Sequence, residues 1–213
     1  VVHLDTIPND DRFDEQWALY NPPSRKDIHA PEAWNIFTGS SDVVVAVLDT
    51  GIDLDHPDLA ANIWTNPNDP VGGGDNDLNV FVDDINGWDF VNDDNNPDDE
   101  IKFFSHGTNG AGIIAATTNN QEGIAGINWQ ISLMVLKISP TLTEAVQAIE
   151  YAINNGARII NASFGENKSS DAMKDAIKTA GEKGVLFVAA ADDSSYDNDK
   201  NPFYPASYDL PNI

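Results

Sequence analysis

Asp49 and His106 are the side chains in this sequence whose types and surroundings suit proton transfer. Asp49 follows an apolar run and starts the tripeptide Asp-Thr-Gly, and His106 starts His-Gly-Thr 57 residues later. A carboxylate that binds one ring nitrogen of a histidine stabilises the protonated ring, so the other nitrogen can take a proton from a hydroxyl group. Because a lone histidine is more often structural than catalytic, the elements around the two residues must decide their role.

Four apolar, β-branched runs are typical of strands that are buried on both faces. They cover residues 43–49, 132–138, 157–163 and 185–191. Apolar residues at helical spacing lie between them, over 142–153 with Thr141 or Thr143 as N-cap, over 169–183, and from about His106 to Ala116. Strands that alternate with helices of this length predict an α/β fold with a parallel central sheet.

Polar side chains stand where these predicted strands end. Asp49 ends the first run, Ser163 ends the third, and Asp193 follows the fourth. In parallel sheets the ligand crevice lies at the carboxyl ends of the strands. We therefore expect these three residues to line one crevice.

Length, composition and charge limit the classes of function. The 213 residues, 41% of them hydrophobic, suffice for the core of one domain. The absence of cysteine excludes disulfides, thiol nucleophiles and thiolate metal sites. A net charge of −24 argues against nucleic acid as a partner, and no apolar run approaches the roughly 20 residues that cross a bilayer. Residues 1–42 are predicted to form an arm packed on a domain of residues 43–213.

The wider context resembles the subtilase family of serine proteases. Asp-Thr-Gly alone is weak evidence, since aspartic proteases use the same tripeptide. Here it is followed, in order, by His-Pro-Asp-Leu (56–59), His-Gly-Thr (106–108), Gly-Ile-Ala-Gly (123–126), Ile-Asn-Ala-Ser-Phe-Gly (160–165), Val-Ala-Ala-Ala (188–191) and Tyr-Pro-Ala-Ser-Tyr (204–208). The resemblance runs from about Asn9 to Ile213. It implies a subtilisin-like three-layer fold that is incomplete at its C-terminus.

The resemblance also implies roles for single residues. Asp49 and His106 would be two members of an Asp-His-Ser triad that hydrolyses peptide bonds. Ser163, Phe164 and Gly165 would form the extended segment that pairs with the substrate backbone. Asp193 would stand at the oxyanion position.

The sequence departs from the family pattern in four places near the cleft. The nucleophile of the family lies in a Gly-Thr-Ser segment beyond the 204–208 stretch, and no Gly-Thr-Ser occurs in this chain. At the oxyanion position the family has an asparagine, whereas an ionised Asp193 has no proton to donate. Asn109 and Gly110 replace the family's His-Val, and the segment 138–143, part of the cleft wall, is several residues shorter.

Acidic residues form three sets with the spacing of calcium ligands. Residues 51–100 contain 14 Asp and Glu and no Lys or Arg, together with aromatic residues that disordered acidic tails usually lack. The first set, similar to a loop of thermitase-like subtilases, is Asp89, Asn92, Asp94, Asn96 and Asp98. The second, which resembles the start of an EF-hand loop, is Asp75, Asp77, Asn79 and Asp83 or Asp84. The third combines distant residues, Asp10, Asp58 and Asn120. We therefore expect one to three Ca²⁺ sites.

These features favour a calcium-stabilised serine endopeptidase domain that is inactive as this chain alone, because the serine is missing. The alternative is a degenerate subtilase that serves as a binding or structural module. Expected partners are an extended polypeptide and a possible second chain that carries the serine segment. Calcium binding at millimolar affinity favours an extracellular or secretory-lumen location.

Overall fold

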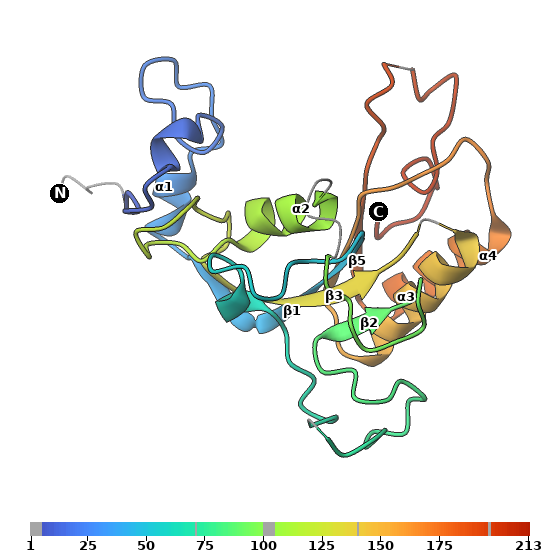
Figure 1. Ribbon diagram of the computed structural model, residues 1–213. Helices are drawn as coiled ribbons and strands as arrows, with labels where there is room; N and C mark the ends of the chain where they lie inside the picture. The colour runs from blue at the N-terminus through green and yellow to red at the C-terminus, as the bar shows by residue number, and fades with distance from the viewer. Residues whose placement is uncertain (1–5, 71, 100–104, 140, 196) are drawn as a thin grey trace.

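Five strands form one parallel sheet in the order β2-β3-β1-β4-β5 (Figure 1). The computed structural model describes residues 6–70, 72–99, 105–139, 141–195 and 197–213. Residues 1–5 of the predicted arm and residue 140 of the shortened wall segment lie outside this described part. The parallel sheet confirms the predicted fold class.

The four predicted strands are present, with shifted ends. They are β1 (Gly39–Asp49), β3 (Gln130–Lys137), β4 (Ile159–Ala162) and β5 (Leu186–Ala189). β1 starts before the apolar run, and its register against β3 is irregular between Gly39 and Val44. A fifth strand that we did not predict, β2 (Gly87–Asp89), pairs with β3 at one edge of the sheet.

The helices follow their sequence signals closely. α2 spans His106–Ala115, α3 spans Leu142–Asn154 and α4 spans Asp171–Glu182. The Thr141 side chain accepts a hydrogen bond from the backbone N–H of Glu144, so Thr141 is the N-cap of α3. Gly156 and Gly184 follow α3 and α4 with positive φ angles of 81° and 79°, the conformation in which helices commonly end.

The sheet lies between two helical layers, with α2 on one side and α3 and α4 on the other (Figure 1). One face packs on α3 and α4 and includes Leu48, Ile160 and Phe187. The other face packs on α2, where Val45 and Val47 meet Ala111 and Ala115. The strand ends carrying the predicted site residues lie between these layers.

The N-terminal residues form a small separate cluster. Phe13 in the 3₁₀ turn η1 (Phe13–Glu15) and Trp34 in α1 (Ala30–Trp34) pack with Ala125, and the indole N–H of Trp34 donates to the carbonyl of Ile127. A second 3₁₀ turn, η2, spans Ala60–Asn62. None of the helices in the described ranges has the length and apolar character to cross a bilayer.

Candidate active site

Asp49 and His106 are in direct contact, as the sequence predicted. Nδ1 of His106 lies 2.7 Å from Oδ1 of Asp49. The Asp49 side chain is 5% exposed and the His106 side chain is 63% exposed. A buried carboxylate therefore orients an imidazole whose other nitrogen remains accessible, which is the arrangement needed for a general base.

The local backbone fixes both partners. The N–H of Thr50 donates to Oδ1 of Asp49, and the N–H of Gly107 donates to Oγ1 of Thr50. A Cβ atom at position 107 would lie 2.1 Å from the carbonyl oxygen of Gly51, so only glycine allows α2 to start this close to the end of β1. Among the described residues, none forms a hydrogen bond with the buried Oδ2 of Asp49.

One open cleft joins the pair to the other predicted site residues. His106 and Ser163 line it together with Phe164 and Asp193. An adjoining hollow, lined by Asp49, His106 and Ser163 among others, lies beside the same ring. The structure therefore brings together the residues that we expected at the strand ends.

Asp193 is exposed and has no donor group of its own to offer when ionised. Its backbone N–H donates to Oδ1 of Asp192, whose φ angle of 72° is the left-handed conformation that favours glycine. The sequence difference at this position thus places two carboxylates at the rim of the cleft.

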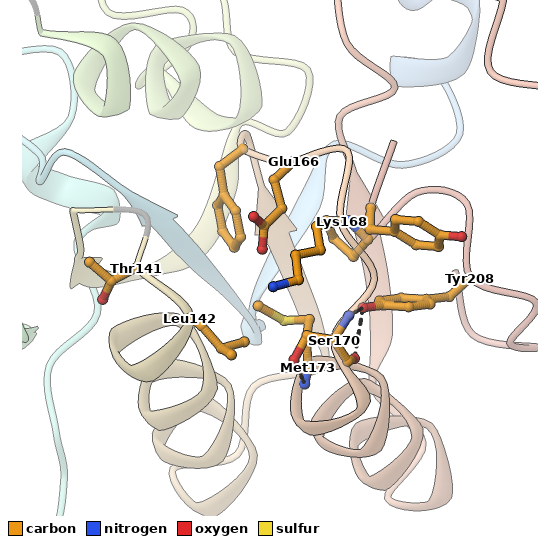
Figure 2. Close-up of a pocket in the computed structure, with 11 residues that line it drawn as sticks. Thr141, Leu142, Glu166, Lys168, Ser170, Met173 and Tyr208 are labelled. Atoms are coloured by element: carbon orange, nitrogen blue, oxygen red, sulfur yellow. Dashed lines mark hydrogen bonds between the residues drawn. The ribbon is translucent and has the colours of Figure 1, made fainter. Parts of the chain in front are cut away.

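A second pocket, of about 90 Å³, is lined by Phe164 and by residues of α3, α4 and the 204–208 segment (Figure 2). Figure 2 shows Leu142 from α3 and Met173 from α4 on one side, and Glu166 and Lys168 on the other. Gly165 also lines this pocket, and a Cβ atom there would lie 2.3 Å from the ring of Phe203. No sequence pattern indicates this pocket, because its walls come from three separate segments.

The rim of this pocket is held by two sets of hydrogen bonds. Glu166 and Tyr204 exchange backbone hydrogen bonds of 2.8 Å in both directions. The hydroxyl of Tyr208 donates to the carbonyl of Ser170 and accepts from its N–H, at the start of α4. The 204–208 motif therefore positions one wall of the pocket.

The third acidic set is brought together by the fold. Asp10 and Asp58 are both buried; Asp10 accepts from the N–H of Asn119, and Oδ1 of Asp58 accepts from the side chain of Asn120. Burial raises the pKa of Asp58 and the nearby Asp10 carboxylate adds to this, against the opposing hydrogen bonds from Ile124 and Asn120. Oγ1 of Thr117 in the same loop is buried and, within the described part of the chain, unpartnered.

The second set forms a hydrogen-bonded loop. The side chain of Asn79 donates to both Asp77 and Asp84, and Asp75 accepts from the N–H of Asn79. The hydroxyl of Tyr151 in α3 donates to the fully buried Asp84.

Two further properties of this loop follow from its burial and its backbone. Burial raises the pKa of Asp84 despite the donors around it, and burial beside that carboxylate raises the pKa of Tyr151 further above its usual range. Leu78, Val80 and Asp83 have φ angles of 59°, 76° and 53°, a costly conformation for such side chains.

The first set is arranged differently. Asp89 is fully buried and pairs with the ammonium of Lys137 at 2.8 Å, while Asn92 donates to the same carboxylate. Asp98 accepts from the N–H of Leu54, and Asp94 accepts from the N–H of Asn96. Within the described ranges, no group of three or more His, Asp or Glu side chains has the arrangement of a metal site.

Comparisons with known proteins agree with this geometry. The sequence profile of the subtilase family matches residues 40–212. Thermitase from Thermoactinomyces vulgaris is 34% identical over 206 residues, which cover 94% of this chain and 62% of that protein. A thermophilic serine proteinase from Bacillus sp. strain AK1 is 34% identical over 207 residues, which cover 95% of this chain and 44% of that protein.

A solved structure supports the same relationship. A protease structure from Pseudoalteromonas arctica PAMC 21717 superposes with a TM-score of 0.74 at 30% identity, and covers 95% of this chain and 63% of that one. The chain thus spans less than two thirds of the length of each of these relatives.

Proposed function

This chain belongs to the subtilase family of serine proteases, and from this premise we propose that it supplies the Asp- and His-bearing part of a serine endopeptidase. The observation that carries the proposal is the 2.7 Å contact between Asp49 and His106 at the edge of a cleft that Ser163 and Asp193 also line. The chain contains no Gly-Thr-Ser. The nucleophilic serine is therefore proposed to come from a further segment, and this chain alone is proposed to be inactive.

The reaction follows from the positions of these groups. The accessible Nε2 of His106 takes the proton of the serine hydroxyl as its oxygen attacks the substrate carbonyl carbon. The protonated ring then gives this proton to the leaving amine as the peptide bond breaks and an acyl-enzyme forms. Water hydrolyses the acyl-enzyme by the same proton transfers. Asp49 stabilises the positive charge that develops on the ring.

Substrate is proposed to bind as an extended strand along Ser163, Phe164 and Gly165. These residues follow β4, and Phe164 lies between the cleft and the second pocket, since it lines both. An extended substrate would place one side chain in the cleft and a side chain further along in the pocket bounded by Leu142 and Met173.

Calcium is proposed at the pair formed by Asp10 and Asp58, with Asn120 as a third ligand. Two buried carboxylates that repel each other fit a hard cation, and so does the buried Thr117 hydroxyl beside them, which has no hydrogen-bond partner among the described residues. The hydrogen-bonded second set would be a further site. We do not extend the proposal to the first set, since Lys137 already neutralises Asp89. When bound, the ion would neutralise the carboxylates and hold the N-terminal segment to the 117–124 loop, and its affinity would suit an extracellular location.

The variant Asp58→Asn tests the calcium site through stability. An acid with a raised folded-state pKa binds more protons when folded, so without calcium it loses stability as the pH rises above the usual Asp value. In EDTA at pH 7, Asp58→Asn is therefore expected to melt at or above the wild-type Tm. With calcium at about 100 times its Kd, worth about 2.7 kcal/mol, the wild type is expected to melt some 5–10 °C above the variant.

The control for this test is the exposed Asp55, whose replacement by asparagine should leave the calcium response unchanged. An equal calcium response of Asp58→Asn and the wild type would rule out a site at this pair.

A fluorophosphonate probe tests the proposed activity. The complete protein is expected to be labelled at a serine outside these 213 residues, and His106→Ala should lose the labelling while keeping its Tm. The 213-residue chain alone should not react. A folded complete protein that fails to react would instead support a non-catalytic binding module, the reading favoured by the acidic oxyanion position at Asp193.

A further inference from the structure

Asp99 is a buried carboxylate that the proposed mechanism does not use. It is only 2% exposed and lies between β2 and α2 in the chain. It does not line the cleft, so it is not placed to touch a substrate there. Because burying a carboxylate costs free energy, its position beside the elements that carry Asp49 and His106 calls for an explanation.

The Asp99 carboxylate accepts a hydrogen bond from a threonine of α2. Oγ1 of Thr108 donates to Oδ2 of Asp99 at 3.1 Å, and Thr108 itself is buried. The same Oγ1 accepts a hydrogen bond of 3.0 Å from the N–H of Asp53. Thr108 lies in the first turn of α2, and Asp53 lies just after the end of β1. Thr108 thus ties the helix that starts at His106 to the turn that follows Asp49.

The direction of these two hydrogen bonds depends on Asp99. A hydroxyl group has one proton to donate and two lone pairs that can accept. Because Thr108 gives its proton to Asp99, a lone pair remains for the N–H of Asp53. Without the carboxylate, the buried hydroxyl would lose this acceptor, and rotating its proton toward another would weaken the contact with Asp53.

Backbone contacts hold Asp99 itself against the turn after β1. The N–H of Asp99 donates to the carbonyl of Ile52 at 3.2 Å, and the N–H of Ile52 donates to the carbonyl of Pro97 at 3.3 Å. A Cβ atom at position 51 would lie 2.6 Å from the carbonyl oxygen of Pro97, so this close approach requires Gly51. The 97–99 segment is therefore fixed on the turn, and Thr108 fixes α2 on both.

We propose that Asp99 is a positioning residue for His106 and that it acts through Thr108. The contact between His106 and Asp49, at 2.7 Å, joins segments that are 57 residues apart in the chain. Thr108 holds the helix on one side of this contact and, through Asp53, the turn on the other. The proposal rests on the proposed function, because the position of His106 affects a reaction rate only if the ring transfers the proton.

The test compares Thr108→Val with Thr108→Ser in the complete protein. Valine has the shape of threonine without the hydroxyl, whereas serine keeps the hydroxyl. A displacement of about 1 Å in a catalytic group can cost about 10²-fold in rate, so Thr108→Val is expected to lower kcat on a chromogenic peptide about 10- to 100-fold. KM should change little, because neither Thr108 nor Asp99 lines the cleft. Thr108→Ser should recover most of the lost kcat.

Asp99 is tested by its own variant and by a double variant. Asp99→Ala removes the acceptor of the Thr108 hydroxyl and is expected to lower kcat as much as Thr108→Val does. The double variant should lose no more than either single variant, because the two residues act as one unit.

A second measurement does not depend on activity. A proton on Nδ1 of His106 that is bound to the buried Asp49 carboxylate should give a low-field ¹H NMR resonance that exchanges slowly with water. This resonance is expected to be lost or shifted in Thr108→Val and in Asp99→Ala. In Thr108→Ser it should stay as in the wild type.

The matched control is Thr118→Val. Thr118 is as buried as Thr108, donates to the carbonyl of Ala116 and accepts from the N–H of Gly126, and it lies outside β1 and α2. The control variant therefore removes a hydroxyl with the same two kinds of hydrogen bond. It should lower Tm about as much as Thr108→Val and leave both kcat and the His106 resonance unchanged.

Three results would overturn the positioning role. They are a wild-type kcat and resonance in Thr108→Val, additive losses in the double variant, and an equal loss of kcat in Thr118→Val. If the complete protein fails to react with the fluorophosphonate probe, the proposed function is wrong. The resonance of His106 in Thr108→Val and Thr108→Ser then decides on the positioning role by itself.

Discussion

Replacing Asp49 by asparagine is expected to lower kcat of the complete protease about 10⁴-fold. Oδ1 of Asp49 accepts from both Nδ1 of His106 and the N–H of Thr50. An amide in this place cannot stabilise the charged ring and favours the wrong tautomer. In subtilisin, loss of the corresponding aspartate lowers kcat about 3 × 10⁴-fold, which sets the scale of the effect.

The measurement is kcat on a chromogenic peptide, with Tm as a check of folding. Asp42→Asn, at an exposed residue of the same strand, is the control and should keep full activity. Retention of more than a tenth of the activity in Asp49→Asn would contradict the assigned role.

Replacing Asp193 by asparagine is expected to raise kcat of the complete protease about 10²- to 10³-fold. Asp193 lines the cleft beside His106, where the proposed reaction would develop negative charge on the substrate carbonyl oxygen. An ionised carboxylate repels this charge, whereas an asparagine amide donates a hydrogen bond to it, and one such donor is worth about 10²- to 10³-fold.

The effect should appear in kcat with little change in KM, since the oxyanion exists only in the transition state. The control is Asp199→Asn, which removes an exposed carboxylate from the same segment without touching the cleft. If Asp193→Asn and Asp199→Asn changed kcat equally, the loss of net charge would be the cause, and the oxyanion role of position 193 would be wrong.

The strand ends could be predicted because the strands of a parallel sheet are buried on both faces. A strand buried on both faces has an uninterrupted apolar run, so the polar residue that follows the run marks the end of the strand in the sequence. Asp49 is the last residue of β1, and Ser163 directly follows β4. β2 could not be predicted, because three residues within an acidic loop give no periodicity. The start of β1 could not be predicted either, because its first four residues, Gly-Ser-Ser-Asp, carry no apolar signal.

Contacts between segments that are far apart in the chain could not be predicted from the sequence. Acidic spacing identified the loop of Asp89, but its cationic partner Lys137 comes from another strand. Tyr151 lies 67 residues from Asp84 and has the pattern of an ordinary core residue of a helix. The spacing of carboxylates in the sequence indicates which loops fold back on themselves. Whether each carboxylate is then paired with a metal ion, a lysine or a hydroxyl depends on which distant segments the fold brings next to it.

The loop that carries Leu78 and Val80 also bears on how the proposed protease would resist its own activity. A peptidase that binds substrate by strand addition needs several consecutive residues in extended conformation. This loop exposes apolar side chains that would attract such a cleft, yet Leu78, Val80 and Asp83 turn its backbone left-handed, and Asp75 and Asn79 hold it there. As long as its carboxylate hydrogen bonds persist, the loop would be a poor substrate for the proposed activity, so its folding would protect the molecule from cleavage by its neighbours.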